Sequence, residues 1–286
     1  MSIEVRHLSH TYSEGSALRT VALEDVSFTV TDGEFVGIVG HTGSGKSTLV
    51  QHLNGLLQPT SGQVLVDGED LNGEHVNRRL LRQRIGLVFQ YAETQLFEET
   101  VAKDVAFGPK NLGLSPEETD TRVREAMERV GLSYADLAER SPFELSGGQM
   151  RRVAIAGVIA MRPEMLVLDE PAAGLDPLGR REIMDLIRGF HQAGTTVVMV
   201  SHSMDDVAEN ASRIIVMEQG QVTMDGTPET IFADAERLVA LDLDVPQTCR
   251  LSLALRKQWP DFPMCVRADE AYEALLARLK GGKAHA

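Results

Sequence analysis

Cysteine is scarce in this 286-residue sequence, which contains only Cys249 and Cys265. The two are far apart and form no metal-ligand pattern, so the sequence indicates neither a disulfide framework nor a zinc site. We expect a reduced, cytosolic chain in which both cysteines are buried structural thiols.

Positive charge is also in short supply. Lys and Arg total 28 residues against 42 Asp and Glu, which gives a formal net charge of -14 at pH 7. Such a charge repels nucleic-acid phosphates and anionic lipids. We therefore expect no nucleic-acid partner, and we expect membrane contact only through partner subunits.

Long apolar runs are missing as well. A stretch such as Ala154 to Met161 falls well short of the roughly 18–20 residues that a spanning helix needs. Met1 to His10 carries charged residues and no apolar core, so we expect no signal peptide. The 43% hydrophobic and 24% charged residues are typical of a globular protein, and the length suits one large α/β domain with an appendage or two modest domains.

Strand patterns dominate the beginning of the chain and recur later. Alternating segments and short apolar segments predict five strands, at Ile3–Arg6, Val26–Val30, Phe35–Val39, Met165–Leu168 and Thr195–Val200. Between the last two, a helical face is formed by Ile183, Leu186, Ile187 and Phe190. Apolar strands alternating with a helix indicate a parallel sheet covered on both faces.

The middle and the end of the chain are instead helical. Few strand-like windows occur between Ala92 and Leu145, and one helical face there carries Val123, Ala126, Met127 and Val130, with Gly131 as the stop. A turn cluster at 225–228 places a boundary near Thr227. In the tail beyond it, Tyr272, Leu275, Leu276 and Leu279 form one apolar stripe.

The segment Gly40-His41-Thr42-Gly43-Ser44-Gly45-Lys46-Ser47 matches the P-loop pattern G-x-x-x-x-G-K-[ST] without a departure. Its glycines let successive backbone N–H groups point at a phosphate, and the following helix adds its positive end. Lys46 would reach the β- and γ-phosphates, Ser47 would supply an oxygen to Mg²⁺, and Thr48 would reach the α-phosphate. The sequence therefore predicts a nucleotide-binding site.

An acidic pair, Asp169-Glu170, ends the apolar strand that begins at Met165. At the carboxyl edge of a parallel sheet, Asp169 would hold Mg²⁺ beside the P-loop, and Glu170 would polarise the water that attacks the γ-phosphate. Taken alone, the pair could equally be a solvated strand end.

A third motif, Leu145-Ser146-Gly147-Gly148-Gln149, opens a helix. Ser146 could simply cap that helix, or the glycines could leave N–H groups exposed for a phosphate. Local chemistry leaves both interpretations open.

The order of these motifs resembles that of the ATP-binding cassette (ABC) ATPases, over Ile3 to about Phe232. The resemblance implies an α/β P-loop NTPase fold with a RecA-like parallel core, an N-terminal antiparallel β subdomain and a helical signature subdomain inserted at about 92–162. It divides the chain into an ATPase domain, residues 1–227, and a C-terminal accessory or dimerisation extension, residues 228–286.

The resemblance also implies ATP and Mg²⁺ as ligands and assigns further roles. Gln90 matches the glutamine that touches Mg²⁺ or the attacking water, and His202 matches the histidine that contacts the γ-phosphate. Ser146, Gly147, Gly148 and Gln149 match the signature that grips a nucleotide held by a second cassette, and Asp176 matches an aspartate at the dimer interface. Tyr12 matches the aromatic that stacks on adenine, although it could equally be a plain strand residue.

A finer resemblance is to the energy-coupling factor (ECF) transporters, specifically to the second, A-prime ATPase of the group II type. It rests on Gly40–Ser44, Gln51–Leu57, Gln95–Glu98, Asp104–Pro109 and Ala173–Pro177; Ala172 departs from an expected threonine. It implies a heterodimer with a sister ATPase, a transmembrane T component and a substrate-binding S component at the cytoplasmic face of the membrane. The helical insert would dock the membrane subunit or only pack on the core. The tail would form dimer contacts or pack on its own domain.

Three alternatives share the core motifs. A cobalt- or nickel-type importer with a single kind of ATPase and an ordinary ABC importer both stay open. A soluble ABC protein acting on ribosomes or DNA is disfavoured by the acidic charge, and Ser47 to Glu144 leaves no room for a long coiled-coil arm.

Overall fold

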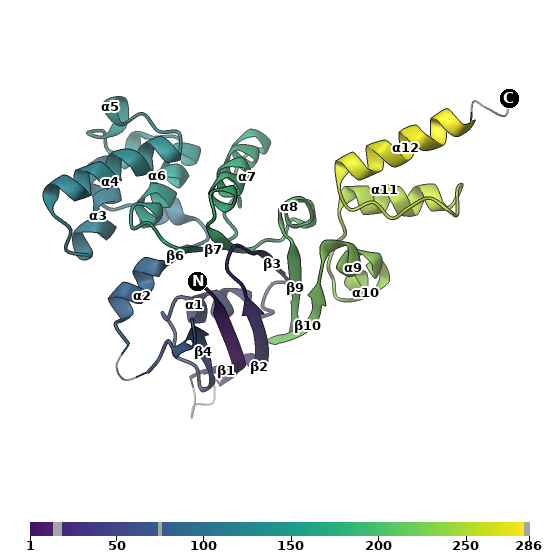
Figure 1. Cartoon of the computed structure of the whole chain (residues 1–286), viewed down its shortest axis with the longest axis horizontal. Coiled ribbons are helices and arrows are strands. Elements are labelled where there is room, and N and C mark those ends of the chain that lie inside the picture. Colours follow the sequence, from purple (N-terminus) through teal and green to yellow (C-terminus); the bar gives the residue numbers. More distant parts are fainter. Residues whose placement is uncertain (14–18, 74–75, 283–286) are drawn as a thin grey trace.

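A six-stranded sheet forms the centre of the molecule (Figure 1). The structure is a computed structural model that describes residues 1–13, 19–73 and 76–282. The strand order is β10-β9-β3-β8-β7-β6, parallel except for the edge strand β10. The strands are β3 (Phe35–Val39), β6 (Ile85–Val88), β7 (Met165–Asp169), β8 (Thr196–Val200), β9 (Arg213–Glu218) and β10 (Gln221–Gly226). The predicted parallel sheet is confirmed.

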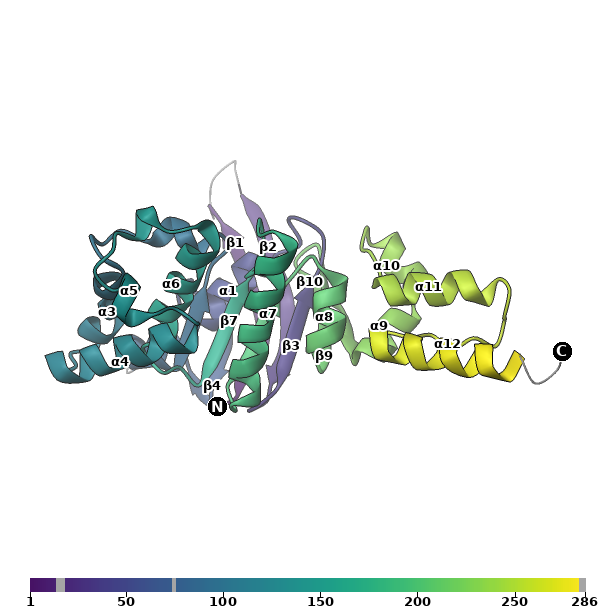
Figure 2. The same ribbon diagram turned by 90° about the horizontal axis from the view of Figure 1, so that it is seen from above.

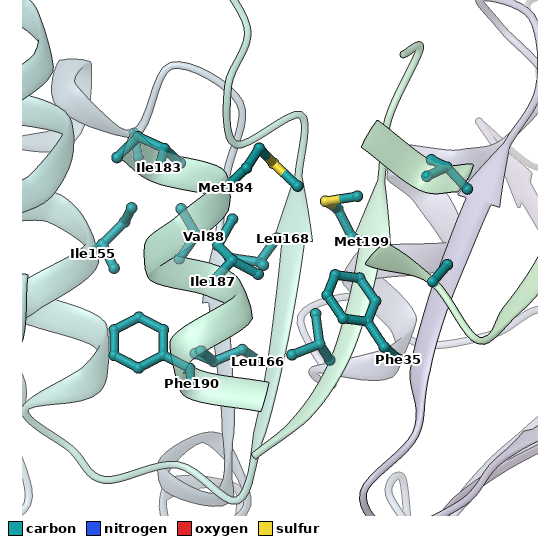
Figure 3. Close-up of a cluster of buried hydrophobic side chains, with 14 of the residues drawn as sticks. Phe35, Val88, Ile155, Leu166, Leu168, Ile183, Met184, Ile187, Phe190 and Met199 are labelled. Atoms are coloured by element: carbon teal, nitrogen blue, oxygen red, sulfur yellow. The ribbon is translucent and has the colours of Figure 1, made fainter. Parts of the chain in front are cut away.

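Alternate residues of these strands enter two separate cores, because successive side chains of a strand point to opposite faces. On β3, Phe35 and Val39 belong to a core that we call the helix-side core. It is shared with the helices α6 (Gly147–Ile159), α7 (Pro177–Gln192) and α8 (Met204–Asn210). Val36 and Ile38 belong to a strand-side core on the other face. Figure 3 shows the helix-side core, in which side chains of α7 reach down onto the strands. Burial on both faces explains why these strands are apolar throughout.

A second, antiparallel sheet covers the strand-side core, with the order β2-β1-β4-β5. Its strands are β1 (Ile3–Tyr12), β2 (Thr20–Val30), β4 (Ser61–Val66) and β5 (Glu69–Asp70). The helix α1 (Lys46–Leu53) contributes Leu49, Val50 and Leu53 to the same core. The N-terminal antiparallel subdomain is therefore present, and it holds α1 against the central sheet.

Helices fill the segment between β6 and β7, as the sequence predicts. They are η1 (Ala92–Gln95), α3 (Val101–Asn111), α4 (Pro116–Arg129), α5 (Tyr134–Leu137), η2 (Pro142–Glu144) and α6 (Gly147–Ile159). All four residues predicted for the apolar face of α4 are buried, and Gly131 follows with φ +73°. Besides α1, the ATPase domain (residues 1–227) contains α2 (Arg78–Arg84), α7 (Pro177–Gln192) and α8 (Met204–Asn210) outside the helical insert. On α7, Met184 is buried where the sequence placed Leu186, which is only partly buried.

Thr227, near which the turn cluster places the boundary, caps the first helix of the tail. It contains α9 (Pro228–Ala233), α10 (Ala235–Ala240), α11 (Gln247–Arg256) and α12 (Ala268–Gly282), and it lies at the opposite end of the sheet from the helical insert (Figures 1 and 2). Phe232 and Leu238 are fully buried in the helix-side core, so the first two tail helices pack on the cassette.

The outer tail has a small core of its own, built around Phe262, Cys265 and Ala271 with Trp259 packed against it. Both cysteines are free and buried, as expected. On α12, by contrast, Tyr272 and Leu279 are exposed. No helix within the described ranges is long and apolar enough to cross a membrane.

Candidate functional site

Four strands of the central sheet deliver predicted site residues to the same edge. The P-loop follows β3, Asp169 and Glu170 end β7, His202 follows β8, and Gln90 follows β6. Since these strands are parallel neighbours, their carboxyl ends meet. The sheet thus gathers residues that are far apart in the sequence.

The P-loop turns between strand and helix in a way that requires glycine. Gly45 has φ +100°, and a Cβ there would lie 2.5 Å from the carbonyl oxygen of Ala22. A Cβ on Gly40 would lie 2.3 Å from the carbonyl oxygen of Met217. The first turn of α1 has no side-chain cap, so its backbone N–H groups face the loop. This is the geometry of an anion site at a helix N-terminus.

Lys46 is folded into that loop and is almost completely buried. Its Nζ donates hydrogen bonds to the carbonyl oxygens of Gly40, at 2.7 Å, and His41, at 2.8 Å. Burial lowers the pKa of Lys46, and the carboxylates of Glu170 and Asp169 act in the opposite direction. The ammonium group is therefore held close to the acidic pair.

Asp169 and Ser47 present oxygen atoms to the same place. Burial raises the pKa of Asp169, whereas a hydrogen bond with Ser47 and the charge of Lys46 lower it. A carboxylate and a hydroxyl within hydrogen-bond reach of one another are ligands that Mg²⁺ accepts, with phosphate oxygens and water completing its shell. The residues present fit this ion.

Glu170 is a buried carboxylate that lacks a full set of partners. Its backbone has φ +51°, and among the described residues none donates a hydrogen bond to its Oε1 atom. His202 Nε2 lies 3.2 Å from that oxygen without hydrogen-bond geometry. Burial raises the pKa of Glu170 to about 7, while burial and nearby Lys46 lower the pKa of His202. A carboxylate poised near neutral pH suits a general base.

Tyr12 lies at the end of β1, beside the P-loop helix. Its hydroxyl is 3.2 Å from Thr48 Oγ1, and its ring packs edge-on against the ring of His10. Tyr12 is therefore both a strand residue and an exposed aromatic next to the phosphate loop.

The signature residues lie apart from this edge. Ser146 caps α6 by accepting a hydrogen bond from the N–H of Gln149, whose side chain accepts one in return from the N–H of Ser146. The cap, one of the two interpretations that the sequence left open, is therefore present. A Cβ on Gly147 or Gly148 would meet nothing within 4 Å. Within the described chain, no hydrogen bond or ion pair connects Ser146 with residues 40–48. Asp176 similarly caps α7, by accepting from the N–H of Gly179.

Two charged residues near the site were not found by sequence reasoning. Arg151 of α6 forms a bidentate ion pair with Glu93 of η1. The available signal was the position of Arg151, which precedes Ile155 and Ile159 at helical spacing on the buried face of α6. An arginine in an apolar stripe indicates a specific partner.

Comparison with known proteins supports this assembly of motifs. The sequence pattern of the family described as ABC transporter matches residues 23–173. The chain is 56% identical to the energy-coupling factor transporter ATP-binding protein EcfA2 of Symbiobacterium thermophilum, over 99% of this chain and 98% of that protein. It is 51% identical to the protein of the same name from Clostridioides difficile, over 98% and 99%.

Solved structures give the same result for the fold. The structure of cbiO1 from Clostridium perfringens, described as part of the ABC transporter complex cbiONQ, has a TM-score of 0.73 and 37% identity over 89% of this chain and 98% of that one. A dimeric ATP-binding cassette, MJ0796, in a post-hydrolysis state with ADP and Pi has a TM-score of 0.71 and 30% identity over 79% and 98%.

Proposed function

Because this chain belongs to the ABC transporter family, with ECF transporter ATP-binding proteins among its full-length relatives, we propose that it is the ATP-binding and ATP-hydrolysing subunit of an ECF transporter. It would power the uptake of vitamins or other micronutrients. The observation that carries this proposal is the meeting of P-loop, acidic pair and His202 at one edge of the sheet.

Each residue at that edge has a role that its environment supports. Backbone N–H groups of residues 40–48 and the Lys46 ammonium bind the phosphates. Ser47 and Asp169, with Gln90, would hold Mg²⁺, which would neutralise charge on the β- and γ-phosphates. Glu170 takes a proton from the attacking water, and His202 contacts the γ-phosphate. Tyr12 stacks on the adenine.

The signature acts on a nucleotide bound by a second cassette. Among the described residues outside α6, none has an atom within 4 Å of a Cβ built on Gly147 or Gly148, and the N–H groups of these two residues, in the first turn of α6, have no partner within the helix. Phosphates held by the P-loop of a partner cassette would accept hydrogen bonds from these N–H groups. Asp176, at the proposed interface, would help to position the two cassettes. We propose a heterodimer with a sister ATPase, in which ATP closes the interface and hydrolysis opens it.

Membrane contact would run through a groove on the helical insert. A cavity of about 560 Å³ lies between β6, η1, α3 and α6, and exposed Phe97 and Phe107 form an edge-on pair at its rim. Its largely apolar lining suits a short helix of a transmembrane T component, which would in turn associate with an S component. The subunit would then work at the cytoplasmic face of the membrane without entering it.

Two substitutions test the assigned chemistry. In the chain purified with its partners, Glu170→Gln should still bind ATP but lose at least about 100-fold in turnover, because the water loses its base. Lys46→Ala should lose nucleotide binding itself. Undiminished hydrolysis by Glu170→Gln would remove Glu170 from the mechanism, and normal ATP binding by Lys46→Ala would contradict the P-loop assignment.

Co-purification tests the assembly. The tagged chain, extracted from its own membranes in detergent, should bring with it a second, non-identical ABC ATPase, one polytopic subunit and small membrane proteins. The similarity to cbiO1 favours one rival, a cobalt- or nickel-type importer. Recovery of this chain as the only ATPase, together with a membrane subunit, would favour that rival. Recovery of ribosomes in place of membrane proteins would refute transport.

A further inference from the structure

Arg151 is the largest fully buried side chain of the described structure, with 1% of its surface exposed. A guanidinium keeps its charge at any physiological pH, so burial requires that its donors be satisfied. Arg151 Nε and Nη2 donate to the Glu93 carboxylate at 2.5 and 2.9 Å. Nη1 donates to the carbonyl oxygen of Pro171 at 2.6 Å, and Nη2 also donates to that of Ala173 at 3.1 Å.

Arg151 and its partners belong to three different segments of the site. Arg151 lies in the second turn of α6, the helix that Ser146 caps. Glu93 lies in η1, three residues after Gln90. Pro171 directly follows Glu170, and the N–H of Ala173 donates back to the carbonyl oxygen of Glu170 at 3.1 Å. One side chain therefore joins the signature helix, the segment after Gln90 and the turn that follows Glu170.

The same contacts extend to the groove on the helical insert. Ala92, Gln95 and Leu96, the neighbours of Glu93, line that cavity. A partner segment bound in this groove would contact η1. Through Glu93, η1 is connected to Arg151. Since the ion pair is bidentate and its guanidinium is buried, a shift of η1 has to move Arg151 or break the pair.

We propose that Arg151 is a positioning residue for ATP hydrolysis, which with Glu93 fixes the turn after Glu170 relative to the signature helix and to the wall of the groove. The acceptors of Arg151 are the Glu93 carboxylate and the carbonyl oxygens of Pro171 and Ala173, all of them protein atoms. Arg151 acts by holding the backbone from which the Glu170 carboxylate projects. The inference rests on the proposed role of Glu170 as the base.

Lysine cannot replace this side chain. A guanidinium has five donors in a planar fork, and Arg151 uses the fork to bridge one carboxylate and two carbonyls. An ammonium retains the charge but cannot reach all of these acceptors at once. Arg151→Lys therefore removes the connection while leaving a cation opposite Glu93.

The test is steady-state ATP hydrolysis by the full chain purified with its partner subunits. Arg151→Lys should lower kcat at least about tenfold, because small displacements of a catalytic group cost this much or more, while the KM for ATP stays within about twofold of the wild type. The matched control is Arg122→Lys. Arg122 is also mostly buried and also donates to one carboxylate and one carbonyl, of Glu118 and Met161, but both lie within the helical insert. The Arg122→Lys variant should hydrolyse ATP with a kcat close to that of the wild type.

A double variant separates positioning from mere stability. Glu93→Gln alone should lower kcat, and Glu93→Gln combined with Arg151→Lys should be no slower than Arg151→Lys alone, because both act through one connection. A kcat for Arg151→Lys within about twofold of the wild type would overturn the inference. So would equal losses in kcat and in ATP affinity, or additive effects of the two substitutions.

Glu170→Gln, measured in parallel, keeps the two claims apart. If it hydrolyses ATP normally, the role of Glu170 fails, whatever Arg151→Lys does. If it is inactive and Arg151→Lys is normal, only the present inference fails.

Discussion

At the scale of single residues, the site is recognisable as a cluster of buried charges, in which the Oε1 atom of Glu170 has no hydrogen-bond partner among the described residues. Lys46, Asp169 and Glu170 are nearly inaccessible, and burial shifts the pKa of each toward the neutral form. Arg151 is buried too, but its Nε, Nη1 and Nη2 atoms all donate hydrogen bonds to protein acceptors. Glu170 can therefore still accept a hydrogen bond from a ligand, whereas the donors of Arg151 are used to connect segments of the protein.

Backbone conformation at Gly45 should be as important as any side chain. Gly45→Ala forces a Cβ into the carbonyl of Ala22 and requires a left-handed alanine. We expect a loss of at least about 1–2 kcal/mol in stability and weaker ATP binding, measured by thermal denaturation and nucleotide titration. Gly189→Ala is the control: Gly189 lies within α7, no atom lies within 4 Å of its added Cβ, and the substitution should stabilise slightly. Equal effects of the two would contradict this account.

The aromatic ring of Tyr12 gives a second residue-scale prediction. Tyr12→Ala should weaken ATP binding about tenfold, because stacking on a base is worth about 1–3 kcal/mol. Tyr12→Phe keeps the ring and loses only the hydroxyl contact with Thr48, so its affinity should stay close to that of the wild type. An equal loss in both variants would show that the hydroxyl matters and that the ring does not stack.

At the scale of elements, the sequence could predict whatever depends on local periodicity. The β3 strand and the buried face of α4 are confirmed, and of the two interpretations left open for Ser146 the cap is present. The short strand β6 and the run Ile214–Met217 of β9 were not predicted, because four apolar residues fit a strand and a helix segment equally well. The contact between Glu93 and Arg151 joins positions far apart in the chain, and no periodicity within one segment could indicate it.

Arg84, at the end of α2, ties separate elements together. It pairs with Asp67, between β4 and β5, and with Glu164, before β7. The pKa of Asp67 is lowered, first by the backbone N–H of Ser2 and then by Arg84, and the pKa of Glu164 is lowered first by Arg84.

A carboxyl group whose pKa is lowered by folding stabilises the fold above its unfolded pKa, about 4 here, and loses this contribution as the pH falls through its folded pKa. Arg84→Met should therefore be less stable than the wild type at pH 7, by at most about 1 kcal/mol per partly exposed pair. The difference should shrink below about pH 4. Urea denaturation at several pH values measures it, and a difference that does not change with pH would refute the assignment.

At the scale of the whole molecule, the helix-side core extends from the central sheet into the tail, whereas the strand-side core does not. Since Phe232 and Leu238 complete the helix-side core, the sequence boundary near Thr227 is a change of pattern within continuous packing. A chain ending at Thr227 should lose several buried side chains and melt lower by on the order of 10 °C. A chain ending at Arg267 keeps Phe232 and Leu238 in the helix-side core but loses Ala271 from the small core of the outer tail, so its melting temperature should fall by less than that of the chain ending at Thr227. Similar melting of both, followed by circular dichroism, would mean that the tail is an independent unit.

The single tryptophan of the chain lies in the small core of the outer tail, with the Arg278 guanidinium carbon 5.5 Å from its ring centre. Its fluorescence therefore reports on one end of the molecule, while the catalytic edge carries no tryptophan at all. When tail helices separate or meet a partner, the emission should change without any labelling. When ATP binds at the P-loop of an isolated subunit, the emission should stay as it was. The intrinsic fluorescence of this tryptophan should therefore report on subunit assembly without responding to ATP binding or hydrolysis.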